Sequence, residues 1–119
     1  MKIVSYKDLI VWQKAMAMVE IVYNLTQKMP KEELFSLTNQ IRRAAISVPS
    51  NIAEGFGRQS KKEYQQFLSI ANGSVCEIET QLLLCVRLGY LTEENTRETF
   101  QLLSEIGKMI IAIKQKLKA

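Results

Sequence analysis

The side chains best suited to chemistry in this chain are basic ones that recur around a single segment. Arg42 and Arg43 are adjacent, and Arg58, Lys61 and Lys62 follow shortly after them. Guanidinium and ammonium groups attract the phosphates of nucleic acids, and binding through them weakens as salt is added. These five residues are therefore the candidate nucleic-acid-binding residues, with structured RNA or DNA as the predicted ligand.

The two adjacent arginines have a structural alternative. Neighbouring residues of a helix project about 100° apart, so Arg42 and Arg43 do not serve one surface. Arg43 falls on a polar face, where it could pair with a carboxylate of a neighbouring subunit. Arg42 lies beside the core edge, where it could bond Glu77 or Glu79. A steep loss of affinity with salt would favour phosphate contact over such structural pairs.

The residue types exclude most catalytic sites. The chain contains no histidine, so it has no Ser-His-Asp triad, Cys-His pair or Glu-x-x-His metal motif. Cys76 and Cys85 lie about half a turn out of phase on one predicted helix, so we expect two free thiols. An all-carboxylate metal site made by Glu54, Glu77 and Glu79 is the remaining alternative. We expect no catalytic residue, no cofactor and no metal ion, and hence no enzyme.

Composition indicates one helical domain. The 119 residues are 47% hydrophobic and include only two prolines and five glycines, which favours long helices. The 16 basic and 12 acidic residues give a net charge of +4, which permits phosphate contact without requiring it. Lys114, Lys116 and Lys118 are predicted to complement a helix dipole. Because no apolar stretch is long enough to cross a bilayer and the first residues lack a signal-peptide pattern, we expect a cytoplasmic protein with no membrane contact.

Four amphipathic segments are expected to position these groups. The predicted helices cover residues 8–28, 30–57, 60–88 and 92–118, with Ser60 and Thr92 as N-caps and Gly89 just past a C-terminus. Short connections force neighbouring helices to run antiparallel. The expected fold class is therefore all-α, an up-down-up-down antiparallel four-helix bundle that forms one domain over residues 1–119. The predicted core stripes of the first two helices are Trp12, Ala15, Val19, Val22 and Thr26, and Leu34, Leu37, Ile41, Ala45, Val48 and Ile52.

A second set of residues falls outside these predicted core stripes and is expected to cover an oligomer interface. Monomeric proteins rarely expose large contiguous apolar patches, so a second apolar stripe favours self-association. Scattered surface hydrophobic residues are the alternative. The candidate interface residues are Val11, Met18, Ile21 and Leu25 of the first helix, Ser47 and Ser50 of the second, and Ile70 and Leu84 of the third.

The most distinctive motif is Q-I-R-R-A-A-I-S-V-P-S-N-I-A-E-G-F-G, from Gln40 to Gly57. It places Pro49 inside a predicted helix, where the missing N–H predicts a kink, and Asn51 is expected to satisfy the carbonyls that Pro49 leaves free. With the S-x-x-E-x-x-x-F-L sequence from Ser60 to Leu68, this motif resembles the four-helix-bundle proteins encoded in intervening sequences of bacterial large-subunit ribosomal RNA genes.

That resemblance spans nearly the whole chain and implies both an assembly and a function. Members of this family, including the accessory variability proteins of diversity-generating retroelements, are similar in forming a ring-like homopentamer. For the retroelement branch the resemblance implies binding to nucleic acid and to a reverse transcriptase. The resulting hypothesis is a non-enzymatic homo-oligomer, a pentamer by resemblance, that binds structured RNA or DNA through a basic surface of the ring. The alternative is a protein-interaction scaffold or accessory subunit without direct nucleic-acid contact.

Overall fold

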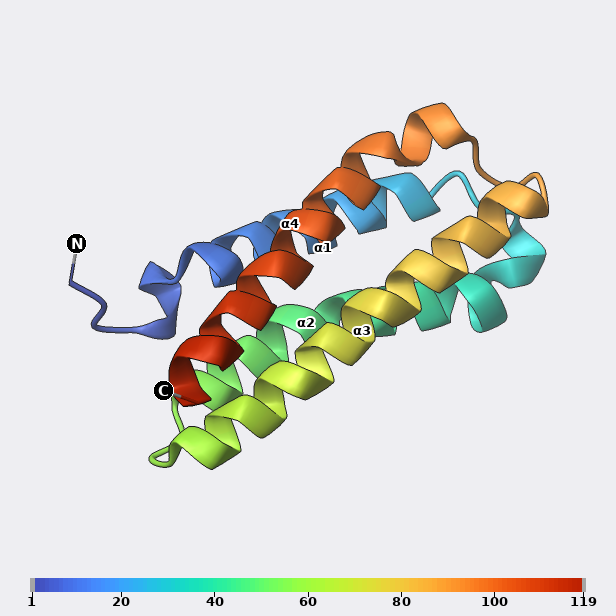
Figure 1. Cartoon of the computed structure of the whole chain (residues 1–119). Helices are drawn as coiled ribbons and strands as arrows, with labels where there is room; N and C mark the ends of the chain where they lie inside the picture. The colour runs from blue at the N-terminus through green and yellow to red at the C-terminus, as the bar shows by residue number, and fades with distance from the viewer. Residues whose placement is uncertain (1, 119) are drawn as a thin grey trace.

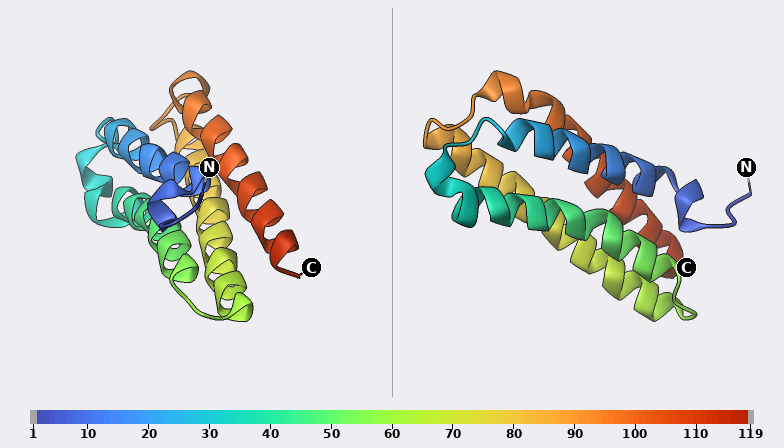
Figure 2. Two further views of the ribbon diagram at one scale, coloured as in Figure 1. Left: turned by 90° about the vertical axis from the view of Figure 1, so that its left-hand side faces the viewer. Right: turned by 180° about the vertical axis from the view of Figure 1, so that it is seen from behind.

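The four amphipathic segments fold into four long antiparallel helices. The computed structural model describes residues 2–118 and contains α1 (Ile10–Thr26), α2 (Asn39–Phe56), α3 (Lys61–Arg87) and α4 (Glu93–Lys118) (Figure 1). α1 packs against α2 and α4, and α3 packs against the same two helices. The helices therefore stand in the order α1, α2, α3, α4 around a bundle of 44 × 24 × 21 Å (Figure 2). The predicted all-α four-helix bundle is confirmed.

Local capping chemistry defines where α3 and α4 begin and where α3 ends. The Ser60 hydroxyl oxygen accepts a hydrogen bond from the Glu63 amide at 3.1 Å, and the Thr92 hydroxyl oxygen accepts one from the Asn95 amide at 3.0 Å. Gly89 has a φ of 81°, a left-handed conformation that glycine adopts without strain. These predicted helix ends are confirmed. The sequence Ser60-Lys61-Lys62-Glu63 also predicts a capping box, in which the Glu63 carboxylate accepts from the Ser60 amide. In the structure it accepts from the Ser60 hydroxyl at 3.1 Å instead.

The connection into α2 is less regular than the sequence pattern predicts. A short 3-10 helix, η2 (Lys31–Glu33), is followed by a π-helical turn, η3 (Leu34–Thr38), and regular α-helix begins only at Asn39. A π turn holds more residues than an α turn, so the apolar stripe changes phase there. As a result Leu34, predicted to be a core residue, is exposed. The first helix is likewise shorter than predicted, and a 3-10 turn, η1 (Tyr6–Asp8), precedes α1.

The core uses a different stripe of α1 from the predicted one. α1 carries two apolar stripes one residue apart in phase, and periodicity alone does not rank them. Trp12 and Val19, predicted to be buried, are half-buried at the edge of the core. The prediction of Val11, Met18 and Leu25 as interface residues is therefore wrong, because all three are buried inside the bundle. The buried apolar residues of α1 are Val11, Ala15, Met18, Val22 and Leu25.

α2 and α3 approach each other closely along the distinctive motif. α2 continues as one helix through the buried Pro49. Its Ser47 hydroxyl oxygen accepts a hydrogen bond from the Ser74 hydroxyl of α3 at 2.9 Å. Asn51 donates to the Ser47 carbonyl at 2.8 Å, whereas the carbonyl that Pro49 leaves free belongs to Ala45. The predicted role of Asn51 is therefore wrong, because its side chain bonds the Ser47 carbonyl and not the one that Pro49 leaves free.

Candidate nucleic-acid interface

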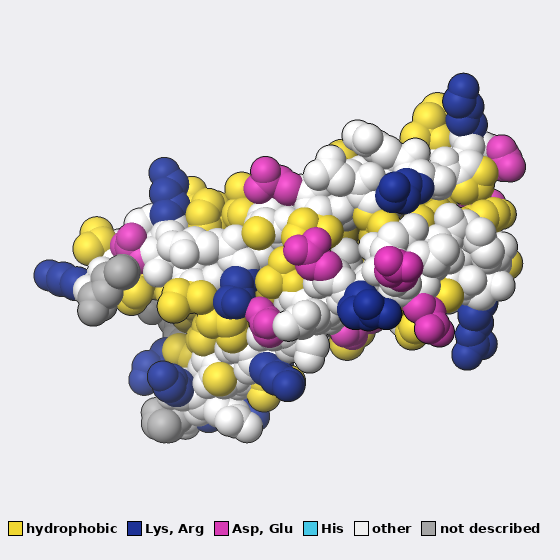
Figure 3. All heavy atoms as spheres, turned by 90° about the horizontal axis from the view of Figure 1, so that it is seen from above, with side chains coloured by type: hydrophobic (Ala, Val, Ile, Leu, Met, Phe, Trp, Pro, Cys, Tyr) yellow, Lys and Arg dark blue, Asp and Glu magenta, His cyan; other side chains and the backbone are white. Residues whose placement is uncertain are grey.

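Three stretches that are far apart in sequence bring basic side chains to one end of the bundle. Antiparallel packing places the N-terminal segment, the α2–α3 connection and the end of α4 together, and we call this the basic end (Figure 1). It carries eight basic residues against three acidic ones, Asp8, Glu54 and Glu63. The eight are Lys2, Lys7, Arg58, Lys61, Lys62, Lys114, Lys116 and Lys118. A space-filling view shows Lys and Arg side chains gathered around the chain ends (Figure 3).

The opposite end of the bundle has the reverse balance. Residues 20–43 and 77–98, which meet there, contain six basic and eight acidic residues. The modest net charge of the whole chain therefore conceals a separation of charge along the long axis. A local excess of one sign attracts counter-charged ligands even where the total charge is small.

The acidic residues of the basic end are already engaged within the chain. The Asp8 carboxylate accepts hydrogen bonds from the Val4 and Ser5 amides at 2.9 and 3.0 Å, and these bonds lower the pKa of Asp8. Glu54 pairs with Arg58 at 2.9 Å, and Glu63 accepts from its helix cap. The lysines of this end have no ion-pair partner within residues 2–118. Their ammonium groups are therefore available to an external phosphate.

Arg58 is held in place by two contacts. Besides its ion pair with Glu54, its guanidinium lies over the Phe67 ring at 4.8 Å from the centroid. Guanidinium stacking on an aromatic ring restricts the side chain without neutralising it. Arg58 lies beside Lys61 and Lys62, so the structure brings these three of the five predicted nucleic-acid-binding residues together.

The other two predicted residues lie apart from them, near the opposite end of α2. The Arg42 Nε donates to the Thr26 hydroxyl at 2.9 Å, and its guanidinium lies 4.7 Å from the Tyr23 ring centroid. The predicted bond from Arg42 to Glu77 or Glu79 is wrong, because Arg42 lies on the side of α2 that faces α1 rather than α3. Arg43 is exposed and makes no ion pair within the described chain.

The remaining predicted interface residues differ in how exposed they are and in whether they are hydrogen-bonded within the chain. Ile70, Leu84 and Ser50 are exposed, as predicted. Ile21 is half-buried on α1. Ser47 is half-buried and hydrogen-bonded to α3 within the same chain, so its small size serves the α2–α3 contact.

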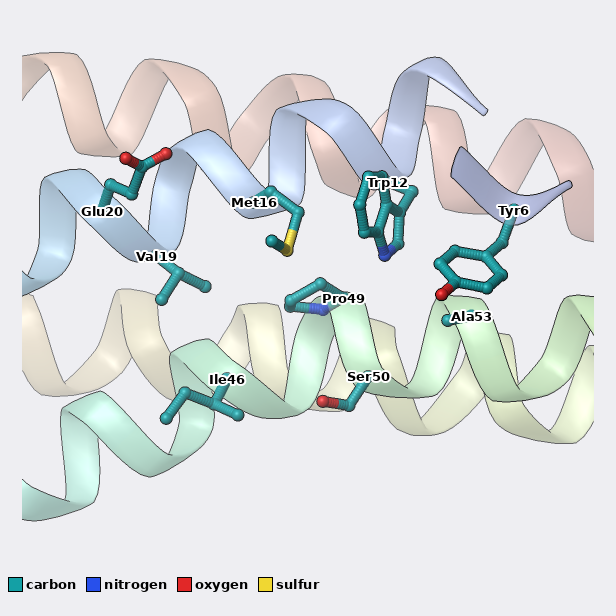
Figure 4. Close-up of a pocket in the computed structure, with 9 residues that line it drawn as sticks. All are labelled: Tyr6, Trp12, Met16, Val19, Glu20, Ile46, Pro49, Ser50 and Ala53. Carbon is teal, nitrogen blue, oxygen red and sulfur yellow. The ribbon is translucent and has the colours of Figure 1, made fainter. Parts of the chain in front are cut away.

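The sequence pattern missed an apolar groove between α1 and α2 (Figure 4). It has a volume of about 430 Å³. The half-buried stripe of α1 that contains Trp12 and Val19 forms one wall, and α2 forms the other. The lining residues are Tyr6, Trp12, Met16, Val19, Glu20, Ile46, Pro49, Ser50 and Ala53. We call this hollow the α1–α2 groove.

The titratable groups in or beside the core, Glu33, Tyr90 and Cys85, make contacts within the chain. The Ser36 hydroxyl donates to the Glu33 carboxylate at 2.6 Å and the Tyr90 hydroxyl donates to it at 3.1 Å, and these bonds lower the pKa of Glu33. Burial, reinforced by the nearby Glu33 charge, raises the pKa of the Cys85 thiol to about 11. Cys76 is exposed, and both thiols are free, as predicted. Among residues 2–118 no three His, Cys, Asp or Glu side chains come together in a way that could hold a metal ion.

These features define a small four-helix-bundle protein with a basic end and an apolar groove between α1 and α2. Within the described range, no helix combines the length and apolar character needed to cross a membrane. The chain belongs to the 23S rRNA-intervening sequence protein family, whose family model matches residues 7–112. The resemblance seen in the sequence motif is thereby confirmed.

A solved structure supports the same assignment. The chain is similar to a protein of unknown function from the S23 ribosomal protein family of Bacteroides thetaiotaomicron, with 28% sequence identity and a TM-score of 0.82. The match covers 88% of this chain and 98% of that one. No curated protein matches the sequence.

Proposed function

We propose that the chain is a non-enzymatic protein that assembles into a homopentameric ring and binds structured RNA or DNA through its basic end. The observation that carries this proposal is the separation of charge along the bundle, with eight basic and three acidic residues at one end. Seven of the eight are lysines, which act as mobile point charges toward phosphate. This composition suits contact with a nucleic-acid backbone.

Ring symmetry would multiply this weak local charge. A cyclic assembly whose subunits stand along the symmetry axis brings the same end of every subunit to one face. One face of the ring would then carry the lysines of all subunits, and the other face would be weakly acidic. Phosphate binding depends on the number of charges neutralised, so repetition raises affinity steeply.

The proposal is tested by binding to an RNA hairpin and a DNA duplex at about 50 and 200 mM salt, with the assembled mass measured in the same buffers. We expect micromolar or tighter binding by an oligomer and a strong loss of affinity at the higher salt. Lys61→Glu/Lys62→Glu should weaken binding on the order of tenfold or more, because each subunit loses two positive charges and gains two negative ones.

A matched control comes from the opposite end of the bundle. Lys28 and Lys31 are also exposed lysines, and their double replacement by Glu changes the net charge equally. This control should alter affinity about twofold or less if the basic end is the contact surface, because screening limits charge effects to roughly 10 Å. Equal losses for both double variants, or affinity that does not change with salt, would contradict the proposed surface.

The second candidate function is a protein-interaction scaffold, and the exposed leucines of α3 and its C-terminal end favour it: Leu83, Leu84 and Leu88 are 54%, 46% and 58% exposed. In this case such an apolar face binds a protein partner, such as a reverse transcriptase. An intact oligomer that binds neither RNA nor DNA at low salt would support this candidate, and the partner would then be sought among proteins.

A further inference from the structure

We infer that the α1–α2 groove holds the α2–α3 edge of a second copy of this chain, with Glu20 of one subunit against Arg43 of the next. This inference rests on the proposed homo-oligomer and identifies its contact surfaces. It is supported by an apolar match and an ionic match, each between groups at similar levels along the bundle.

The groove presents apolar side chains that the bundle leaves uncovered. Met16 on α1 and Ile46 on α2 are 43% and 44% exposed, and Trp12 is half-buried beside them. Figure 4 shows Met16 and Trp12 pointing from α1 toward α2, Pro49 between the two helices, and Ile46 at the outer edge of the groove on α2. Covering such a surface is favourable because it removes apolar area from water.

The α2–α3 edge supplies an apolar residue at the corresponding level. The hydrogen bond between Ser74 and Ser47 fixes the level of α3 relative to α2. Ile70 precedes Ser74 by one helical turn and points to the same edge, and it is 52% exposed. Because the two helices are antiparallel, Ile70 lies level with the part of α2 between Pro49 and Ala53, which lines the groove.

The two charged residues, Glu20 and Arg43, lie at similar levels along the bundle and carry opposite charges. Glu20 and Ile46 line the same groove, with the Glu20 carboxylate turned away from α2 at the outer rim on α1 (Figure 4). Arg43 precedes Ile46 by three residues, about 4.5 Å along the helix. Both side chains are exposed, and neither makes an ion pair within residues 2–118. Arg43 shares a hollow with Glu77, but these two do not approach within 4.0 Å. The chain thus offers a carboxylate without an ion pair on α1, at the groove, and a guanidinium without an ion pair on α2, at the α2–α3 edge.

The positions of the two surfaces fit a closed ring. They lie on adjacent sides of a four-sided bundle and share α2, so they face roughly at right angles. A contact between two unlike surfaces is heterologous, and it closes when the angle between them fits a polygon, about 90° for a tetramer and about 108° for a pentamer. A rough right angle is therefore compatible with a small ring and does not by itself count its subunits. The shared helix α2 would then face the centre of the ring.

A charge-reversal experiment tests the inference. The assembled mass of wild type is measured across a dilution series, beside Glu20→Arg, Arg43→Glu and the double variant. Each single reversal places like charges together at every subunit contact, so the subunit concentration needed for assembly should rise on the order of tenfold or more. The double variant restores opposite charges and should assemble within about threefold of wild type.

The apolar contact is tested in the same assay with a matched pair. Ile70→Asp should impair assembly as strongly as the single reversals, whereas Ile111→Asp should not. Ile111 is 48% exposed on α4, away from both surfaces. Circular dichroism of each variant separates lost assembly from lost folding. For the two charge reversals, recovery of assembly by the double variant also excludes misfolding as the cause.

Each outcome bears on a definite claim. A monomeric wild type would overturn the proposed oligomer and this interface together. An oligomeric wild type that tolerates both single reversals, or a double variant no better than the weaker single one, would overturn this interface alone. RNA binding by wild type is measured separately, so its failure leaves the interface result unchanged.

Discussion

Replacing Gly55 by Ala should destabilise the bundle, although alanine is normally the better helix former. A Cβ atom at this position would lie 2.8 Å from the Phe67 Cβ, 3.0 Å from the Tyr64 Cδ1 and 3.3 Å from the Tyr64 carbonyl oxygen. The Phe67 Cβ and the Tyr64 carbonyl are fixed to the α3 backbone and do not rotate away. Relief of the contact therefore requires α2 and α3 to separate.

The size of the effect follows from two opposing terms. Ordinary contact begins near 3.4 Å, so the gap from 2.8 Å demands a shift of about 0.6 Å. Overpacking of this kind costs about 1–3 kcal/mol. Removing a glycine from a helix gains at most about 1 kcal/mol, and less at Gly55 because it lies in the last turn of α2. We expect a net loss of about 1–2 kcal/mol in the free energy of unfolding.

Urea denaturation at a fixed subunit concentration measures this change. With a slope of about 2 kcal/mol per M, the middle of the usual range for small proteins, the midpoint should fall by about 0.5–1 M. Gly107→Ala provides the control, because its added Cβ would meet only Asn72 at 3.7 Å and Val75 at 3.9 Å. This variant should gain about 0.5–1 kcal/mol. A Gly55→Ala protein as stable as wild type would refute the close-contact argument.

Three further outcomes are expected. Met18→Ala should cost about 2–5 kcal/mol in the same urea assay because the side chain is fully buried, whereas Met16→Ala should have a small effect on subunit stability. Ellman's reagent should modify Cys76 in the native protein and Cys85 only after unfolding, since burial raises the Cys85 pKa to about 11. Backbone hydrogen bonds lower the folded pKa of Asp8, so wild type should exceed Asp8→Asn in thermal midpoint near neutral pH. That advantage should disappear as the pH falls below about 4 and through the lower folded pKa.

The two ends of α3 and the start of α4 were predictable because local chemistry encodes them. Ser60, Thr92 and Gly89 act through neighbours within a few residues, and the structure places them at helix ends as predicted. The choice between the two apolar stripes of α1 was not predictable in this way. Both have helical spacing, and the packing of three other helices decides that Met18 is buried while Trp12 stays at the edge.

The basic end escaped prediction for a different reason. Its lysines come from three segments, each with an unremarkable charge, and only antiparallel packing brings them together. The adjacent arginines were more conspicuous in sequence, yet Arg42 contacts α1 and Arg43 lies away from the lysines. Counting charges along the chain therefore identified basic residues as the candidates but did not identify the surface on which they gather.

The placement of both chain ends on one end of the bundle permits subunits to be joined genetically. In a ring, Lys118 of one subunit would lie on the same face as Lys2 of the next, roughly one bundle width away, 21–24 Å. A flexible linker of about 16 residues has a root-mean-square length of this order. Tandem repeats encoded as one polypeptide would then fold into a covalent ring. The number of repeats at which every subunit interface is occupied within one polypeptide would give the number of subunits in the ring.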